Sequence, residues 1–224
     1  VDSLVNITEQ TAAVVIEPIQ GGSGFITASN NFLHKVRLKC NETGSILIFD
    51  EIQTCFGRLG TLFGFEKYDV IPDILCIAKG MGGGMPIGAF ISSWELMNLL
   101  TFKPKLGHIT TFGGHPINCA ASLATLEHLL AADVMQKVDE KEQLFRLHLK
   151  HPKIKEIRGN GLMLAIEFDD EELAKKVVEQ SLENGLILFY FLFTKTAIRI
   201  TPPLTITDKE IIEGCKIVKG ILEA

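Results

Sequence analysis

Short apolar segments alternate with helical patterns and glycine-rich turns along this chain, and this alternation limits the possible folds more than any other feature. Four continuous apolar runs are the expected strands: 13–17, 45–50, 73–78 and 87–92. A helical pattern at 28–41 separates the first two. Uniformly apolar strands are typical of sheets buried on both faces. The sequence therefore predicts an α/β fold whose mainly parallel sheet is covered on both sides.

The pattern of expected helices and strands changes towards the C-terminus. A helical pattern at 116–150 leads into a smaller α+β unit. Its expected strands lie near 162–168, 186–189 and 197–200, and its expected helices lie near 171–184 and 207–222. Thr207 and Glu210 have the spacing of a capping box at the start of the last helix. We expect a boundary near residue 118, dividing the chain into 1–118, part of a large domain, and 119–224, a small C-terminal domain.

Charge and hydropathy exclude several classes of partner. The chain has 22 Lys and Arg against 27 Asp and Glu, a net charge of −5, which argues against nucleic acid or an anionic membrane as a partner. The longest apolar run, 186–193, is far shorter than the roughly 20 residues of a membrane span. The five cysteines are scattered without a C-x-x-C pair, which favours reduced thiols and a cytoplasmic location.

Metal binding has little support in the sequence. There is no H-E-x-x-H motif. His148 and His151 are three residues apart, but Pro152 follows directly and no acidic or thiol ligand completes a site. We therefore expect no metal centre.

Candidate functional residues follow the expected strands, because ligands of such sheets gather at the carboxyl ends of strands. Glu17, Asp50 and Lys79 each occupy such a position. Asp50 and Glu51 are consecutive acids, so they point to opposite sides. Asp50 either caps the next turn or is a buried carboxylate paired with a cationic ligand atom.

Three further segments could carry chemistry. Lys79 precedes a glycine-rich loop; in an apolar pocket its amine could form a Schiff base, and otherwise it is a surface lysine beside a flexible loop. The segment 108–116 has two hydroxyls and two glycines before a helix, which suits either a phosphate or an ordinary turn. Arg199 could grip a carboxylate with two hydrogen bonds or form a structural ion pair.

Taken together, these segments resemble the class III (ornithine/acetylornithine type) pyridoxal-phosphate aminotransferases of fold type I. Lys79 follows Asp50 by 29 residues, which is also the family's interval. The resemblance covers nearly the whole chain. The matching stretches are 16–21, 47–54, 56–58, 72–75, 78–80, 82–89, 110–114 and 199–204.

The resemblance implies a role for five residues at a pyridoxal 5′-phosphate site. Lys79 would be the Schiff-base lysine, and Asp50 would contact the pyridine nitrogen. Gln53 would contact the ring hydroxyl, Ile52 would pack on the ring face, and Thr111 would reach the phosphate of the neighbouring subunit. Residues 1–118 would then be the C-terminal part of the cofactor-binding large domain.

Substrate binding is implied in the same way for Arg199, which would hold the carboxylate of an amino acid, and for Glu17. Three residues depart from the family pattern. Gly22 replaces a Glu that can pair with this arginine in ornithine-type members, which weakens ornithine itself as the donor. His115 replaces an Asn and Cys55 a Gly, so the phosphate loop and the turn after Asp50 are expected to differ locally.

The implied reaction is transamination between an amino acid, ornithine-like or an acylated ornithine, and 2-oxoglutarate, in a homodimer with a shared active site. Family members have a preceding segment of comparable size that is not seen in this sequence, so we expect an incomplete portion of the enzyme that depends on that segment. Two alternatives remain open: a mutase or decarboxylase of the same family, and a non-catalytic fragment or binding module.

Overall fold

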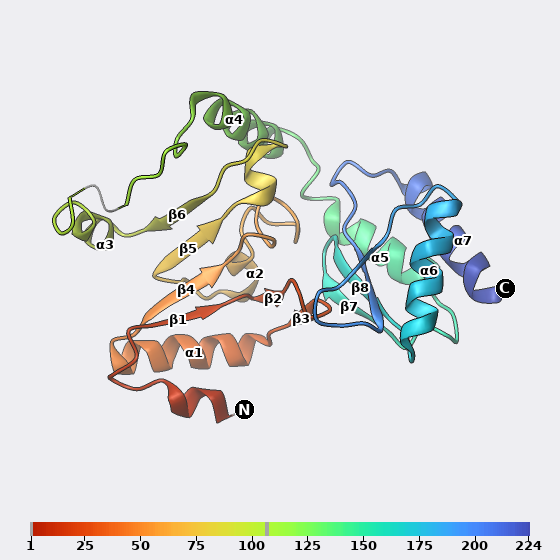
Figure 1. Cartoon of the computed structure of the whole chain (residues 1–224), viewed down its shortest axis with the longest axis horizontal. Coiled ribbons are helices and arrows are strands. Elements are labelled where there is room, and N and C mark those ends of the chain that lie inside the picture. The colour runs from red at the N-terminus through yellow and green to blue at the C-terminus, as the bar shows by residue number, and fades with distance from the viewer. Residues whose placement is uncertain (1, 106–107) are drawn as a thin grey trace. The chain divides into compact units, whose positions relative to one another are not determined.

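The computed structural model describes residues 2–105 and 108–224, which form two compact units (Figure 1). The first unit comprises the segment that ends at Pro18 together with Ala28–Phe56 and Phe63–Ala132. The second unit comprises Ile19–Thr27, Gly57–Leu62 and Asp133–Ala224. The expected boundary near residue 118 lies within α4 (Pro116–Ala131), and the division into 1–118 and 119–224 stays a prediction.

The first unit is built on a four-stranded sheet in the order β1-β4-β5-β6. Its strands are β1 (Ala13–Ile16), β4 (Ile46–Asp50), β5 (Ile74–Ile77) and β6 (Ala89–Ser92). β4 pairs in parallel with β1 and with β5, whereas β6 is antiparallel to β5. The predicted mainly parallel sheet is therefore confirmed, with one antiparallel edge strand.

The expectation that both faces of this sheet are covered is wrong for the described residues. Helix α1 (Asn30–Thr43) buries Leu33 and Val36. On the edge strands, however, Val15 is 67% exposed and Phe90 is 46% exposed. The apolar sequence predicted burial, but these two side chains stay largely exposed in the described structure.

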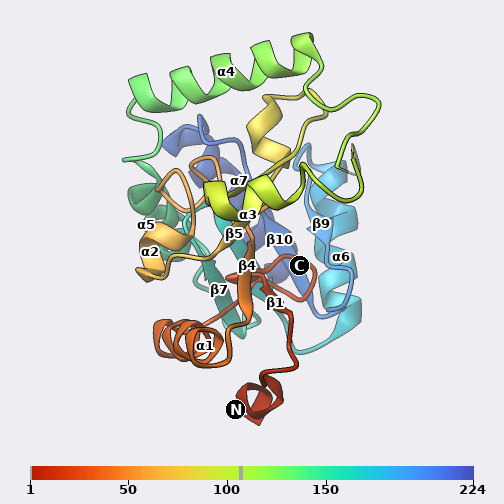
Figure 2. The same ribbon diagram turned by 90° about the vertical axis from the view of Figure 1, so that its left-hand side faces the viewer.

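Several short helices and one long one complete the first unit: η1 (Asp2–Asn6), α2 (Phe65–Tyr68), η2 (Lys79–Gly82), α3 (Trp94–Leu99) and α4. α4 packs against η2, as Figure 2 shows. The predicted continuous helical stretch at 116–150 is two helices, α4 and α5 (Val138–His148), because Ala132 adopts extended backbone (φ −101°, ψ 147°). Leu123 and Leu130 of α4 are exposed, so its leucine spacing did not mark a core face.

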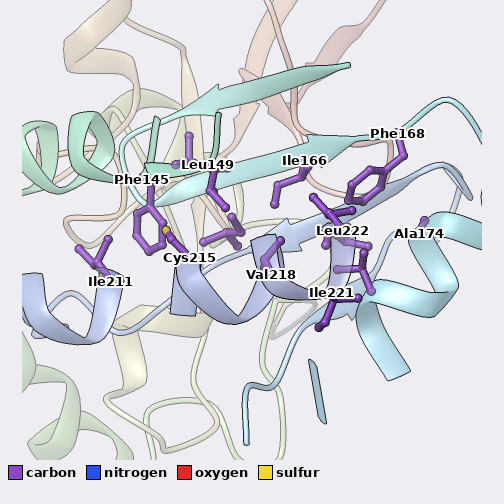
Figure 3. Packing of buried hydrophobic residues seen from close by; sticks show 14 of the residues in the cluster. Phe145, Leu149, Ile166, Phe168, Ala174, Ile211, Cys215, Val218, Ile221 and Leu222 are labelled. Atoms are coloured by element: carbon purple, nitrogen blue, oxygen red, sulfur yellow. The ribbon is translucent and has the colours of Figure 1, made fainter. Parts of the chain in front are cut away.

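The second unit has an antiparallel sheet in the order β7-β8-β10-β9. Its strands are β7 (Glu156–Asn160), β8 (Met163–Glu167), β9 (Phe189–Tyr190) and β10 (Ala197–Ile200). Helices α5, α6 (Glu171–Glu183) and α7 (Asp208–Glu223) contribute to one core cluster with β8 and β10 (Figure 3). The capping box predicted at Thr207 and Glu210 is present at the start of α7.

A short hairpin also belongs to the second unit, although the sequence pattern did not predict it. It consists of β2 (Ile19–Gln20) and β3 (Ile26–Thr27). Ile19 and Phe25 are buried with Leu59, Met163, Ala165, Phe191 and Ala197 in a second apolar cluster. The hairpin therefore brings a segment from early in the chain into the core of the C-terminal unit.

The described residues contain no helix long and apolar enough to cross a membrane. Within the same residues, no group of His, Cys, Asp or Glu side chains is arranged to hold a metal ion. All five cysteines are free thiols.

Candidate active site

Asp50 and Lys79 follow neighbouring strands of the first unit. Asp50 is the last residue of β4, and its partner across the parallel pair is Cys76 on β5. The N–H of Glu51 donates to the Cys76 carbonyl at 2.9 Å, which extends this pairing. Lys79 starts η2 two residues after β5 ends at Ile77. The acid and the amine therefore leave the sheet at the same carboxyl edge, where parallel α/β sheets bind ligands.

Neither of these two side chains is fully buried. Asp50 is half-buried, and its Oδ1 accepts a hydrogen bond from the Ile52 N–H at 3.0 Å. Lys79 is exposed and has a φ of 44°, in the left-handed region that non-glycine residues rarely adopt. The apolar pocket considered for Lys79 from the sequence is not formed by the described residues.

Glu51 is fully buried and organises the turn after β4. Its carboxylate accepts hydrogen bonds from the backbone N–H groups of Gly64 and Phe65, the latter at 2.6 Å, and from the Thr54 hydroxyl at 3.2 Å. Burial raises the pKa of Glu51, and these three donors oppose the shift. The two consecutive acids do have different environments, and the buried one is structural.

The turn after β4 packs directly against the backbone that leads into Lys79. The Cys55 thiol donates to the Ala78 carbonyl at 3.8 Å, and burial raises the pKa of this thiol to about 11. A Cβ built on Gly80 would lie 3.3 Å from the Cβ of Phe56. The replacement of Gly by Cys55 is therefore accommodated between the two segments that carry the candidate residues.

The glycine-rich loop after Lys79 is held against α4. Gly83 has a φ of 57°, and a Cβ at this position would lie 2.1 Å from Oγ1 of Thr125 on α4. Nδ2 of Asn118 donates to the Pro86 carbonyl at 2.6 Å. Glycine is needed here both for the backbone conformation and for the close approach of the loop to the helix.

The remaining residues predicted in this unit lie in turns. Gln53 and Ile52 are half-buried in the turn after Asp50, Thr111 is exposed before α4, and Glu17 is exposed directly after β1. His115 is the N-cap residue of α4 but makes no side-chain capping hydrogen bond. The cofactor and substrate roles of these residues stay predictions.

Arg199 lies on β10 in the second unit, between two aromatic rings. Its guanidinium carbon is 4.7 Å from the ring centre of Phe191 and 5.7 Å from that of Phe25. The two rings are 4.7 Å apart at 86°, an edge-to-face contact. Burial lowers the pKa of Arg199, but a guanidinium remains charged at neutral pH. Its buried Nε has no hydrogen-bond partner among the described residues.

The donors of the first unit fit pyridoxal phosphate, and Arg199 of the second unit fits a carboxylate. An exposed amine can bond to an aldehyde, and a neighbouring carboxylate can pair with a protonated ring nitrogen. The orphaned Nε of Arg199 matches the fork-like binding of a carboxylate by a guanidinium.

Sequence reasoning missed the structural role of Glu51 and the aromatic environment of Arg199. The only signal for Glu51 was its place next to Asp50. Phe25 and Phe191 are far apart in the sequence and meet only through the fold, so no local pattern could have paired them with Arg199.

Comparison with known proteins gives one consistent family. Residues 2–222 match the family model for aminotransferase class-III. The chain is 39% identical over 221 residues to the acetylornithine aminotransferase of Caldanaerobacter subterraneus subsp. tengcongensis, with 96% of this chain and 54% of the relative covered. It is 40% identical over 222 residues to the putrescine aminotransferase of Pectobacterium atrosepticum, covering 96% of this chain and 47% of the relative.

Solved structures agree with this assignment. The ornithine aminotransferase of Toxoplasma gondii ME49 is 33% identical with a TM-score of 0.89, covering 99% of this chain and 55% of that one. A Bacillus anthracis aminotransferase is 30% identical with a TM-score of 0.89, covering 100% and 56%. The chain thus spans about half the length of the relatives that it matches. The match over residues 2–222 shows that this chain belongs to the class III aminotransferase family.

Proposed function

We propose that the protein carries out pyridoxal-phosphate-dependent transamination between an amino acid and 2-oxoglutarate. The observation that carries this proposal is the position of Asp50 and Lys79 at the carboxyl ends of two paired parallel strands. When bound, the cofactor would supply a ring that accepts the electrons left when the carbon bearing the reacting amine loses its proton.

The residues of this chain would bind the cofactor and move one proton. Asp50 would keep a proton on the ring nitrogen through its negative charge. Lys79, as a free amine, would take the proton from the carbon that bears the reacting amine of the substrate. Gln53 would contact the ring hydroxyl, and Ile52 would cover one ring face.

We assign substrate binding to Arg199 and Glu17. Arg199 would hold the substrate carboxylate, with its guanidinium oriented in advance by two rings. Glu17 would line the same site, and Thr111 would contact the cofactor phosphate of a second subunit. We accordingly propose a cytoplasmic homodimer with shared active sites, whose turnover needs the residues that the relatives carry outside the matched half.

The donor we propose is an ornithine-like amino acid, with acylated ornithine preferred over ornithine. Gly22 stands where ornithine-type members have Glu, and a Cβ built there would lie 3.0 Å from the ring of Phe193. An acidic side chain at this position would have to displace that ring. Its absence leaves Arg199 without an acidic partner at this position, so that the guanidinium can bind a substrate carboxylate. The matched relatives include an acetylornithine and a putrescine aminotransferase, which defines the donors to compare.

Covalent labelling tests the lysine. The protein is mixed with pyridoxal phosphate, reduced with borohydride and digested, and the modified lysine is identified by mass spectrometry. We expect the label on Lys79, its loss in Lys79→Ala, and its retention in Lys195→Ala, where the exposed Lys195 pairs with Glu171. A label elsewhere in the longest gene product that contains this chain would contradict the assignment.

Glutamate formation from 2-oxoglutarate tests the reaction. N-acetylornithine, ornithine and putrescine are offered with and without 2-oxoglutarate, to the chain alone and to the longest gene product that contains it. A transaminase releases glutamate only when both substrates are present. A decarboxylase or mutase would consume the donor without 2-oxoglutarate, and a non-catalytic binding module would consume neither.

A further inference from the structure

Arg58 closes the end of the β8–β10 ladder in the second unit. The antiparallel register pairs Ile200 with Leu164, so two residues further on Pro202 stands opposite Leu162. Proline has no N–H and cannot donate to the opposite strand. Arg58 takes its place: Nη1 donates to the carbonyls of Pro202 at 2.6 Å and Leu162 at 3.1 Å, and the Arg58 carbonyl accepts from the Leu162 N–H at 3.0 Å.

The fit around Arg58 is tight. A Cβ on Gly161, which has a φ of 58°, would lie 2.7 Å from the Arg58 carbonyl oxygen and 2.8 Å from Cα of Leu59. Burial lowers the pKa of Arg58, and no ion pair to a carboxylate is found for it within residues 2–105 and 108–224. Arg58 is half-buried. A partly desolvated cation whose partners are backbone carbonyls is costly to keep unless it has a specific role.

Lys141 holds the next part of the same segment. This lysine of α5 is 7% exposed, and its Nζ donates to the Leu204 carbonyl at 2.5 Å. The half-buried Arg58 and the buried Lys141 therefore hold the carbonyls of Pro202 and Leu204, on either side of Pro203. Both prolines lack the N–H that would otherwise tie this segment to a neighbouring strand.

We propose that Arg58 and Lys141 are positioning residues that fix the Pro202–Leu204 segment and thereby the place of Arg199 on β10. Arg199 precedes Pro202 by three residues on a strand of only four, so a shift at the strand end reaches it directly. The expected consequence is tighter binding of substrates that carry a carboxylate. This consequence rests on the proposed function, whereas the positioning itself does not.

Side-chain NMR tests the positioning without any activity. The Nε–H resonance of Arg199 is assigned with Arg199→Lys and compared among variants, because its position relative to the Phe191 ring sets its ring-current shift. We expect Arg58→Met to move this resonance, Lys141→Met to move it less, and Arg58→Lys to restore part of it. Arg146→Met is the matched control, because Arg146 also donates to two backbone carbonyls, Ile157 at 2.6 Å and Gly159 at 2.8 Å, but on β7.

Kinetics test the consequence. For N-acetylornithine, we expect Arg58→Met to raise KM about tenfold or more, the scale of one lost charge-assisted hydrogen bond, with kcat changed less than about twofold. For putrescine, which has no carboxylate, KM stays within about twofold of wild type. Arg58→Lys gives an intermediate KM, and Arg146→Met leaves both substrates unaffected.

The outcomes separate the two proposals. An Arg199 resonance that is unchanged in folded Arg58→Met, or moved equally by Arg146→Met, overturns the positioning role whatever the enzyme does. Equal changes in KM for the two donors overturn the link to carboxylate binding. If the longest wild-type gene product that contains this chain turns over neither donor, the proposed function fails, and the NMR comparison still decides the role of Arg58. If Arg58→Met does not fold, Arg58→Lys and Lys141→Met are compared with wild type instead.

Discussion

The guanidinium of Arg199 lies against the ring of Phe191, 4.7 Å from guanidinium carbon to ring centre, while its buried Nε makes no hydrogen bond among the described residues. A ring face attracts a cation without using its N–H donors. The arrangement therefore holds the charge in place and leaves donors for an anionic ligand. Phe25 contributes a second ring at 5.7 Å.

A double-mutant cycle measures this contact. We expect Phe191→Leu and Arg199→Met to be coupled by about 0.5–2 kcal/mol in the free energy of unfolding, the range for partly desolvated cation–π pairs. Phe49→Leu, in the core of the first unit, is the control and should be additive with Arg199→Met. Denaturant titration gives both values. Additivity in the Phe191 cycle would mean that the contact contributes only packing.

Glu51 predicts an unusual pH dependence of stability. Burial raises its pKa in the folded protein, so between the unfolded pKa near 4.5 and the folded pKa the native state binds more protons than the unfolded state. Stability then falls as pH rises through that window. Glu51→Gln removes this slope but leaves an N–H of Gly64 or Phe65 without an acceptor, at a cost of about 1–3 kcal/mol. The deficit of the variant should be largest at acid pH and shrink towards neutral pH.

Glu210 should contribute a pH dependence of stability of the opposite sign. It accepts from the Thr207 N–H and hydroxyl in the capping box, which lowers its pKa. Its contribution is present above the ordinary carboxyl pKa and is lost as pH falls, so Glu210→Gln should remove a positive slope. Chemical denaturation from pH 2 to pH 7 compares the two variants, because the slope from Glu210 lies below its ordinary pKa of 4.5. A deficit of Glu51→Gln that grows with pH would refute the assignment of Glu51 as a desolvated carboxylate.

The predictable part of this structure is the part that local pattern determines. Asp50 and Lys79 were found because a charged residue directly after a buried apolar strand is rare and the sheet edge collects such residues. β7 was missed because Arg158 and Gly159 interrupt any apolar alternation, and its pairing with β8 supplies the reason for its strand conformation. The contact of Arg199 with Phe25 requires the β2–β3 hairpin to join the second unit, which no local pattern encodes.

The same distinction explains the wrong expectations. Leucine spacing along α4 looks amphipathic, but Leu123 and Leu130 are exposed. Val15 on β1 is likewise apolar but exposed. An apolar side chain is stabilised by burial, but it is buried only where another part of the structure packs against it.

Two glycines of the second unit should respond to alanine in opposite directions. Gly161→Ala places a Cβ 2.7 Å from backbone oxygen at a φ of 58°, and we expect a loss of about 3 kcal/mol or more in the free energy of unfolding. Gly220→Ala, in α7 with open space around it, should gain about 0.5–1 kcal/mol from helix propensity. Thermal and urea unfolding measure both. Similar values for the two variants would contradict the close approach of Gly161 to Arg58.

Thiol reactivity tests the packing of the turn after Asp50. Burial raises the pKa of Cys55 to about 11 and that of Cys215 to about 12, so at pH 8 little of either is thiolate. Cys119 is exposed on α4. With iodoacetamide at pH 8, we expect Cys119 to be alkylated in the folded protein, and Cys55 and Cys215 only after urea is added. Mass spectrometry of the digested protein follows each site over time. Alkylation of Cys55 as fast as that of Cys119 would mean that the turn does not stay packed against Ala78, and the Asp50 and Lys79 segments would then lack the contact that joins them.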